Sequence, residues 1–219
     1  MTKHNKSCEN TSTKIVLTFD CQRKNSLQHL KEIFTTLPEL ASNIVSVIFY
    51  DSLNHEQNFQ VEVEKIISFL QQKNCACLIK NDTRIMGRLK ADGIHFEDIP
   101  EQTIIDYKDK NIIKGVGHIK DKHHAMVIGE NMPDYLFFGR LGFDKNTNLH
   151  KKNAQLAEWW TQIMQIPAIL QAAQTIETIQ QALKIKTEFI AIESFLFDTP
   201  NPIKAATQLQ KIWENRKKL

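Results

Sequence analysis

Eight short apolar runs recur along the 219-residue chain and constrain its fold more than any other feature. Most are continuous rather than alternating, which is typical of strands buried on both faces, as in a parallel sheet. They cover residues 15–19, 44–50, 76–79, 93–96, 112–117, 135–139, 168–170 and 189–192. Helix-type segments separate them. An open doubly wound sheet uses the same elements, but eight strand–helix units ending in a helix favour an α/β fold with a single (β/α)8 TIM barrel.

Three segments carry the clearest helix signals. Apolar residues at steps of three and four from Phe59 to Leu70 predict one helix with a buried face. Thr175 is a suitable N-cap for the next, and Asn201-Pro202 suits the start of the last helix. Residues 1–13 are polar and aperiodic, so we expect a flexible tail over 1–13 and one barrel domain over 14–219.

The composition limits which kinds of partner the protein is expected to have. Lys and Arg number 28 and Asp and Glu 25, which gives a net charge of +3, too small to indicate a nucleic-acid partner. No apolar run approaches the ~18 residues that a membrane span requires, and the N-terminus lacks a secretory signal. We therefore expect a cytoplasmic protein with no membrane partner. If Trp159 or Trp160 is exposed, it would suit a contact within a homodimer.

Active sites of such barrels form at the carboxyl ends of the strands. Asn81 and Asp82 follow the third predicted strand and His118 ends the fifth, while Arg140 and Lys145 follow the sixth. An imidazole suits proton transfer near neutral pH, and the two cations suit an anionic ligand. The residues alone leave simpler roles open, because Asn81-Asp82 is also a good helix cap and the cations are equally suited to solvent.

Several of these strings resemble one family. The chain resembles thiamine-phosphate synthases and the related thiazole tautomerases in Leu78-Ile79-Lys80-Asn81-Asp82, in Ala91-Asp92-Gly93-Ile94-His95 and in Gly115-Val116-Gly117-His118. The likeness runs from about residue 44 to the end. It implies a (β/α)8 barrel, small phosphorylated substrates and Mg2+. The synthases join an aminopyrimidine diphosphate to a thiazole phosphate with release of diphosphate, whereas the other branch tautomerises a thiazole.

The resemblance also implies roles for individual residues. Asp82 takes the place of the first metal ligand, and Asp98 or Glu101 would replace the second. His118 takes the place of the acid–base group of the tautomerases. The expected substrate-binding residues are Asn81, Arg140, Lys145, Ala172 and Ser194.

The chain departs from the family at the positions that hold phosphates. The basic cluster after the second strand is absent, and the Gly-Gly turn after the seventh is Ala172-Ala173. Gly117 replaces a serine, and Glu193 is a carboxylate that would repel phosphate if it faced the pocket. Three functions therefore remain open: a synthase with a remodelled site, a tautomerase-like enzyme that uses His118, and a non-catalytic barrel that binds a small molecule or a protein.

Overall fold

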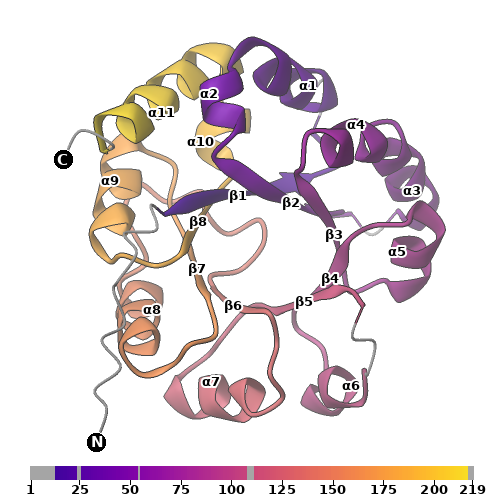
Figure 1. Ribbon diagram of the computed structural model, residues 1–219, viewed down its shortest axis with the longest axis vertical. Helices are drawn as coiled ribbons and strands as arrows, with labels where there is room; N and C mark the ends of the chain where they lie inside the picture. The colour runs from indigo at the N-terminus through magenta and orange to yellow at the C-terminus, as the bar shows by residue number, and fades with distance from the viewer. Residues whose placement is uncertain (1–12, 24–25, 54, 108–110, 217–219) are drawn as a thin grey trace, which may run out of the picture.

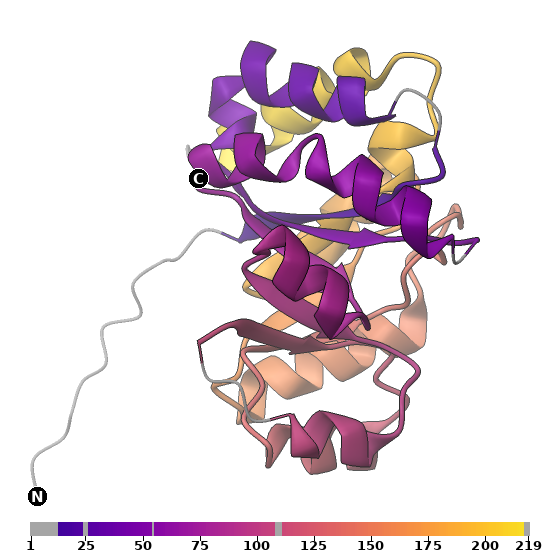
Figure 2. The ribbon, with the colours of Figure 1, turned by 90° about the vertical axis from the view of Figure 1, so that its right-hand side faces the viewer.

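A computed structural model describes residues 13–23, 26–53, 55–107 and 111–216. Eight parallel strands close into one barrel in the order β1 to β8, and β8 pairs with β1. Figure 1 shows the ring of strands with the helices around its outside, and Figure 2 shows the same barrel from the side. The prediction of a single (β/α)8 barrel is confirmed.

The strands follow the apolar runs of the sequence to within one residue at either end. They are β1 (Lys14–Asp20), β2 (Ile44–Tyr50), β3 (Ala76–Lys80), β4 (Gly93–Phe96), β5 (Ile113–Val116), β6 (Tyr135–Phe138), β7 (Ala168–Gln171) and β8 (Phe189–Ile192). The helices are α1 (Ser26–Thr36), α2 (Pro38–Ala41), α3 (Glu56–Glu64), α4 (Ile67–Gln72), α5 (Thr83–Leu89), α6 (Glu101–Asp106), α7 (Lys122–Gly129), α8 (Lys151–Ile163), α9 (Ile176–Lys184), α10 (Ser194–Phe197) and α11 (Pro202–Arg216).

Two apolar cores hold the barrel together. The larger core lies between the strands and the helices, and contains Phe49, Ile79 and Trp160. Among the described residues, the smaller core takes its buried members from strands and from one loop residue, Leu141, and none from a helix. Its members alternate along their strands, as expected of side chains that fill a barrel interior. They are Val16, Ile48, Tyr50, Leu78, Tyr135, Phe137, Leu141, Ile169 and Ala191.

The helix predicted from Phe59 to Leu70 is divided in two. Between α3 and α4 the amide of Ile66 donates to the carbonyl of Val63, three residues back, at 3.0 Å. Ile66 has φ −128° and ψ −22°, outside the range of a regular helix. Val63, Ile66 and Leu70 are all fully buried. The apolar repeat therefore predicted the buried face correctly, whereas the prediction of one continuous helix was wrong.

The first described residue is part of the folded domain. The Thr13 hydroxyl donates to the carbonyl of Thr187, and the Thr13 carbonyl accepts from Trp213 Nε1. Thr13 is buried, which differs from its assignment to a flexible tail. The rest of the expected tail, residues 1–12, lies outside the described residues. Within the described ranges, no helix is long and apolar enough to cross a membrane.

Candidate active site

Two glutamates at strand ends are buried in the mouth of the barrel. Glu193 directly follows β8 and is 0% exposed. It accepts hydrogen bonds from Thr18 Oγ1 at 3.0 Å and from Tyr50 Oη at 2.9 Å, and it pairs with Arg23 at 3.2 Å. Burial, followed by the negative charge of Asp144, raises the pKa of Glu193 to about 7 despite these partners. The side chain is therefore fully engaged inside the protein and does not face a phosphate pocket.

Glu97, after β4, is the second buried carboxylate. Lys80 Nζ lies 2.8 Å from one oxygen, and the amide of Leu141 donates to the other at 2.9 Å. His95 Nε2 is 3.9 Å from that second oxygen. Burial opposes ionisation of Glu97, but the interactions with His95 and Lys80 outweigh it and lower the pKa of Glu97 to about 2. Lys80 is thus already neutralised by a carboxylate of the chain itself.

Asp144 brings the loop between β6 and α8 against the end of β8. Its two carboxylate oxygens accept from the Ser194 amide at 2.7 Å and from Ser194 Oγ at 2.6 Å. Asp144 is buried, and the loop also places Leu141 in the interior core. The hydroxyl and amide of Ser194, which we predicted to bind substrate, are therefore both occupied by a side chain of the protein.

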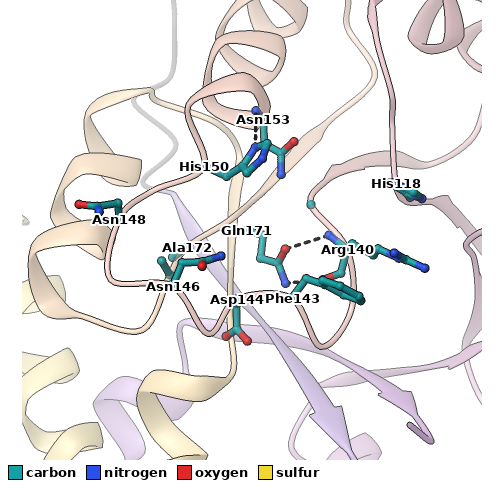
Figure 3. Close-up of a pocket in the computed structure, with 12 residues that line it drawn as sticks. His118, Arg140, Phe143, Asp144, Asn146, Asn148, His150, Asn153, Gln171 and Ala172 are labelled. Atoms are coloured by element: carbon teal, nitrogen blue, oxygen red, sulfur yellow. Dashed lines mark hydrogen bonds between the residues drawn. The ribbon is translucent and has the colours of Figure 1, made fainter.

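A cavity of about 270 Å³ remains on the β5–β7 side of the mouth. It is lined by polar side chains, with the aromatic ring of Phe143 and the small residues of the turn after β7 (Figure 3). The Gln171 side chain holds the backbone of Arg140 by two hydrogen bonds, of 2.8 Å to its amide and 2.7 Å to its carbonyl. The lining residues are His118, Gly139, Arg140, Phe143, Asp144, Asn146, Asn148, His150, Asn153, Gln171, Ala172 and Ala173.

His118 stands at the edge of this cavity and is paired with Asp98. His118 Nδ1 hydrogen-bonds to Asp98 Oδ1, and Arg140 Nη2 lies 2.8 Å from Asp98 Oδ2. Burial opposes ionisation of Asp98, but the hydrogen bond and charge of His118 and the charge of Arg140 together lower the pKa of Asp98. Asp98 and His118 have φ of 56° and 54°, the left-handed region that residues other than glycine seldom occupy. Such backbone conformations cluster at functional sites.

The three predicted metal ligands have other partners. Asp82 Oδ1 caps α5 by accepting from the amides of Arg84 and Ile85, both at 2.9 Å. Asp98 is occupied by His118 and Arg140, and Glu101 lies 3.6 Å from His124. No group of three or more His, Cys, Asp or Glu side chains in the described ranges is arranged to hold a metal ion. The residues present therefore do not fit a Mg2+ site in this conformation.

The remaining predicted residues divide between the cavity and the surface. Ala172 lines the cavity with His118 and Arg140, whereas Lys145 is exposed and is not among the lining residues. Asn81 lines a separate cavity of about 300 Å³ beside Tyr50 and Lys80. Its side chain hydrogen-bonds the backbone amide and carbonyl of Glu97, at 2.8 and 2.7 Å, so its position is structurally fixed.

Sequence reasoning missed Arg23 and Gln171. Arg23 follows β1, and its guanidinium pairs with Glu193 and with Asp198. Its place just after the first strand was a usable signal, because the same rule identified the other strand-end cations. Gln171 is the last residue of β7, but no sequence pattern indicates that its side chain binds the backbone of another loop.

The comparisons with known proteins agree with this architecture. A family model described as "Thiamine monophosphate synthase" matches residues 20–196. The thiamine-phosphate synthase of Rhodospirillum centenum is 26% identical over 155 residues, covering 68% of this chain and 74% of that protein. That of Erythrobacter litoralis is 28% identical over 123 residues, covering 53% and 57%.

Solved structures show the same fold at low sequence identity. Thiamine phosphate pyrophosphorylase from Pyrococcus furiosus has a TM-score of 0.71 at 15% identity, covering 94% of this chain and 97% of that one. 3-Hexulose-6-phosphate synthase has a TM-score of 0.68 at 12% identity, covering 91% and 99%. Because the family model spans most of a barrel whose predicted site residues lie at the expected strand ends, the chain belongs to the thiamine monophosphate synthase family.

Proposed function

We propose that this barrel is a tautomerase-like enzyme that acts on a small phosphorylated thiazole of thiamine biosynthesis, with His118 as the acid–base group. The observation that carries the proposal is the pairing of His118 with Asp98 at the edge of the 270 Å³ cavity. A neutral imidazole takes a proton from one atom of the thiazole and returns a proton to another, so the substrate is isomerised with no other reactant.

The charges around the barrel mouth favour proton transfer over displacement of diphosphate. A diphosphate leaving group develops negative charge that free cations must stabilise. Lys80 is paired with Glu97, and Arg23 is shared by Glu193 and Asp198, so both are already engaged by carboxylates of the chain. Arg140 gives one contact to Asp98 and keeps only its remaining donors for a ligand. Drawing Lys80 to a substrate would remove the cation paired with the buried, ionised Glu97, and breaking such a pair costs about 3–5 kcal/mol. An isomerisation develops no such leaving-group charge.

Arg140 is the cation best placed for the acidic group of such a substrate. Its side chain is 42% exposed at the cavity, and its guanidinium stacks on the Phe143 ring at 4.4 Å. A guanidinium has five N–H donors, so one contact to Asp98 leaves others for a ligand. Gln171 fixes the backbone from which this side chain projects.

The second candidate is the synthase reaction itself, joining an aminopyrimidine diphosphate to a thiazole phosphate. It is supported by the names of three curated relatives, each a thiamine-phosphate synthase. This reaction would require Asp82 with Asp98 or Glu101 to give up their present partners in order to hold Mg2+. We therefore place it second.

Exchange of His118→Asn tests the first candidate. A non-aromatic thiazole phosphate tautomer would be incubated with the protein in D2O, and the aromatic product and its solvent deuterium followed by NMR. We expect the variant to lose turnover by about 10²–10⁴-fold, the usual contribution of an acid–base group. His123→Asn is the matched control, because His123 is an exposed residue of α7. Equal turnover by the His118 variant and the wild type would exclude the role of His118.

A further inference from the structure

Each carboxylate oxygen of Asp98 contacts a different neighbouring side chain. Oδ1 hydrogen-bonds to Nδ1 of His118, and Oδ2 lies 2.8 Å from Nη2 of Arg140. Arg140 is held in turn by the two backbone hydrogen bonds from Gln171 and by the Phe143 ring. The chain of contacts runs from the end of β7 to the end of β5, so the Asp98 carboxylate is fixed from two sides.

The backbone reinforces this arrangement. Asp98 and His118 are each the second residue after their strand, β4 and β5, and both have left-handed backbone conformations. The His118 amide also donates to the carbonyl of Gly139 at 3.0 Å, which ties the turn after β5 to the end of β6. Asp98 and His118 thus lie in adjacent turns, each with a left-handed backbone conformation, and these turns fix the position of the imidazole.

We infer that Asp98 is the positioning residue of His118, which it holds with Nδ1 protonated so that Nε2 is the nitrogen that exchanges protons with the substrate. A carboxylate only accepts hydrogen bonds, so a neutral imidazole facing it must place its proton on Nδ1. Nε2 then carries the lone pair, and no residue in the described part of the chain hydrogen-bonds to it. The exchange of protons with a substrate rests on the proposed function, whereas the tautomer that Asp98 imposes on His118 does not.

The same contact stabilises the charged imidazole formed during turnover. When Nε2 takes a proton, the positive charge of the imidazolium lies beside an ionised carboxylate. The contacts with His118 and Arg140 lower the pKa of Asp98, and Arg140 binds the oxygen that does not face His118. Asp98 therefore acts through His118 rather than as a ligand of a metal ion.

Exchange of Asp98→Asn tests the inference, because asparagine also tolerates the left-handed backbone. Arg140 only donates, so it would hold the amide oxygen and turn the amide NH2 toward His118 Nδ1. Nδ1 must then accept, and the proton of the neutral ring moves to Nε2. We expect ¹⁵N NMR, at a pH where the ring is neutral, to show protonated Nδ1 in the wild type and protonated Nε2 in the variant.

The activity should change with the tautomer. We expect Asp98→Asn to lower kcat by about 10²–10⁴-fold with little change in KM, since the substrate still meets the same cavity. Asp121→Asn is the matched control: Asp121 caps α7 by accepting from the His124 amide at 2.8 Å, and asparagine caps a helix equally well. In this variant, the His118 tautomer and kcat should equal those of the wild type.

The NMR and activity results separate the two proposals. Protonated Nε2 in the wild type, or an unchanged tautomer in Asp98→Asn, would overturn the positioning role whatever the activity shows. The predicted tautomers together with full activity of His118→Asn would support the positioning role and overturn the proposed function.

Discussion

Gly117 shows how a change at one residue is coupled to the side chains of the barrel mouth. It takes the place of a serine in the resemblance that the sequence suggests. A Cβ at this position would lie 2.6 Å from Nε2 and 2.9 Å from Cε1 of His95, and 3.3 Å from a Glu97 oxygen. His95 is fully buried, hydrogen-bonded to Tyr135 Oη at 2.8 Å and stacked on the Tyr135 ring. The absence of a side chain at Gly117 therefore makes room for His95 beside Glu97.

Gly117→Ala should destabilise the protein by about 1–3 kcal/mol, because the added methyl group overpacks a buried site. Urea unfolding would measure the loss. Gly87→Ala is the matched control, since a Cβ there meets nothing within 4 Å and Gly87 lies in α5, where alanine is favoured by up to about 1 kcal/mol. Equal stability of Gly117→Ala and the wild type would show that His95 has room to move.

Glu193 gives the stability of the fold a pH dependence. Its pKa is raised from an ordinary 4.5 to about 7 in the folded protein, chiefly by burial. Between these two values the folded chain binds more protons than the unfolded chain, so this contribution to stability is complete below about pH 4.5 and is lost as the pH rises through about 7.

Comparison of the wild type with Glu193→Gln isolates that contribution. From about pH 5 to about pH 8, we expect the free energy of unfolding of the wild type to fall by about 2–3 kcal/mol relative to the variant, because glutamine does not titrate. Denaturant unfolding at both pH values measures it. A difference between the two proteins that stays constant with pH would contradict the raised pKa.

At the scale of the element, helix α9 begins as its sequence predicts. Thr175 Oγ1 accepts from the Thr178 amide and Thr178 Oγ1 accepts from the Thr175 amide, both at 3.3 Å, which forms a capping box. The same local reasoning failed between α3 and α4, where the tertiary packing of Ile66 ends the first helix. Caps depend on neighbours in sequence, whereas the continuity of a helix depends on what it packs against.

Thr175→Ala should lower the free energy of unfolding by about 1 kcal/mol, because the Thr178 amide at the start of α9 loses the hydroxyl that accepts its hydrogen bond. His55→Ala is the control, since His55 occupies the N-cap position of α3 and its side chain makes no capping hydrogen bond. Thermal unfolding of both variants measures the difference. Similar losses in the two variants would show that the capping box contributes nothing.

At the scale of the whole molecule, the sequence predicted the barrel but not the network in its mouth. The eight apolar runs are local signals, and the strand-end rule placed His118 and Arg140 at the cavity. Two of the partners of Glu193, Thr18 and Tyr50, are 175 and 143 residues away in sequence, and they meet it only because β8 closes on β1. The pairing of Asp98 with His118 likewise depends on how the turns after β4 and β5 fold, and no local pattern in the sequence indicates it.

Trp160 is not the exposed tryptophan that a contact between two copies of the chain would use. Trp160 is fully buried, and its Nε1 donates to the Ile166 carbonyl at 2.9 Å. Trp159 is partly buried against the core, with Lys122 Nζ 4.8 Å from its ring centre. The homodimer therefore remains a prediction from the sequence.

Whether the barrel performs the synthase reaction decides between the two candidate functions. The purified protein would be mixed with aminopyrimidine diphosphate, thiazole phosphate and Mg2+, and thiamine phosphate followed by mass spectrometry beside an active synthase. We predict no product above the protein-free control, because Lys80 and Arg23 are paired with carboxylates of the chain and Arg140 has only part of its donors left for a diphosphate. Magnesium-dependent formation of thiamine phosphate that Asp82→Ala abolishes would contradict the account and establish the second candidate.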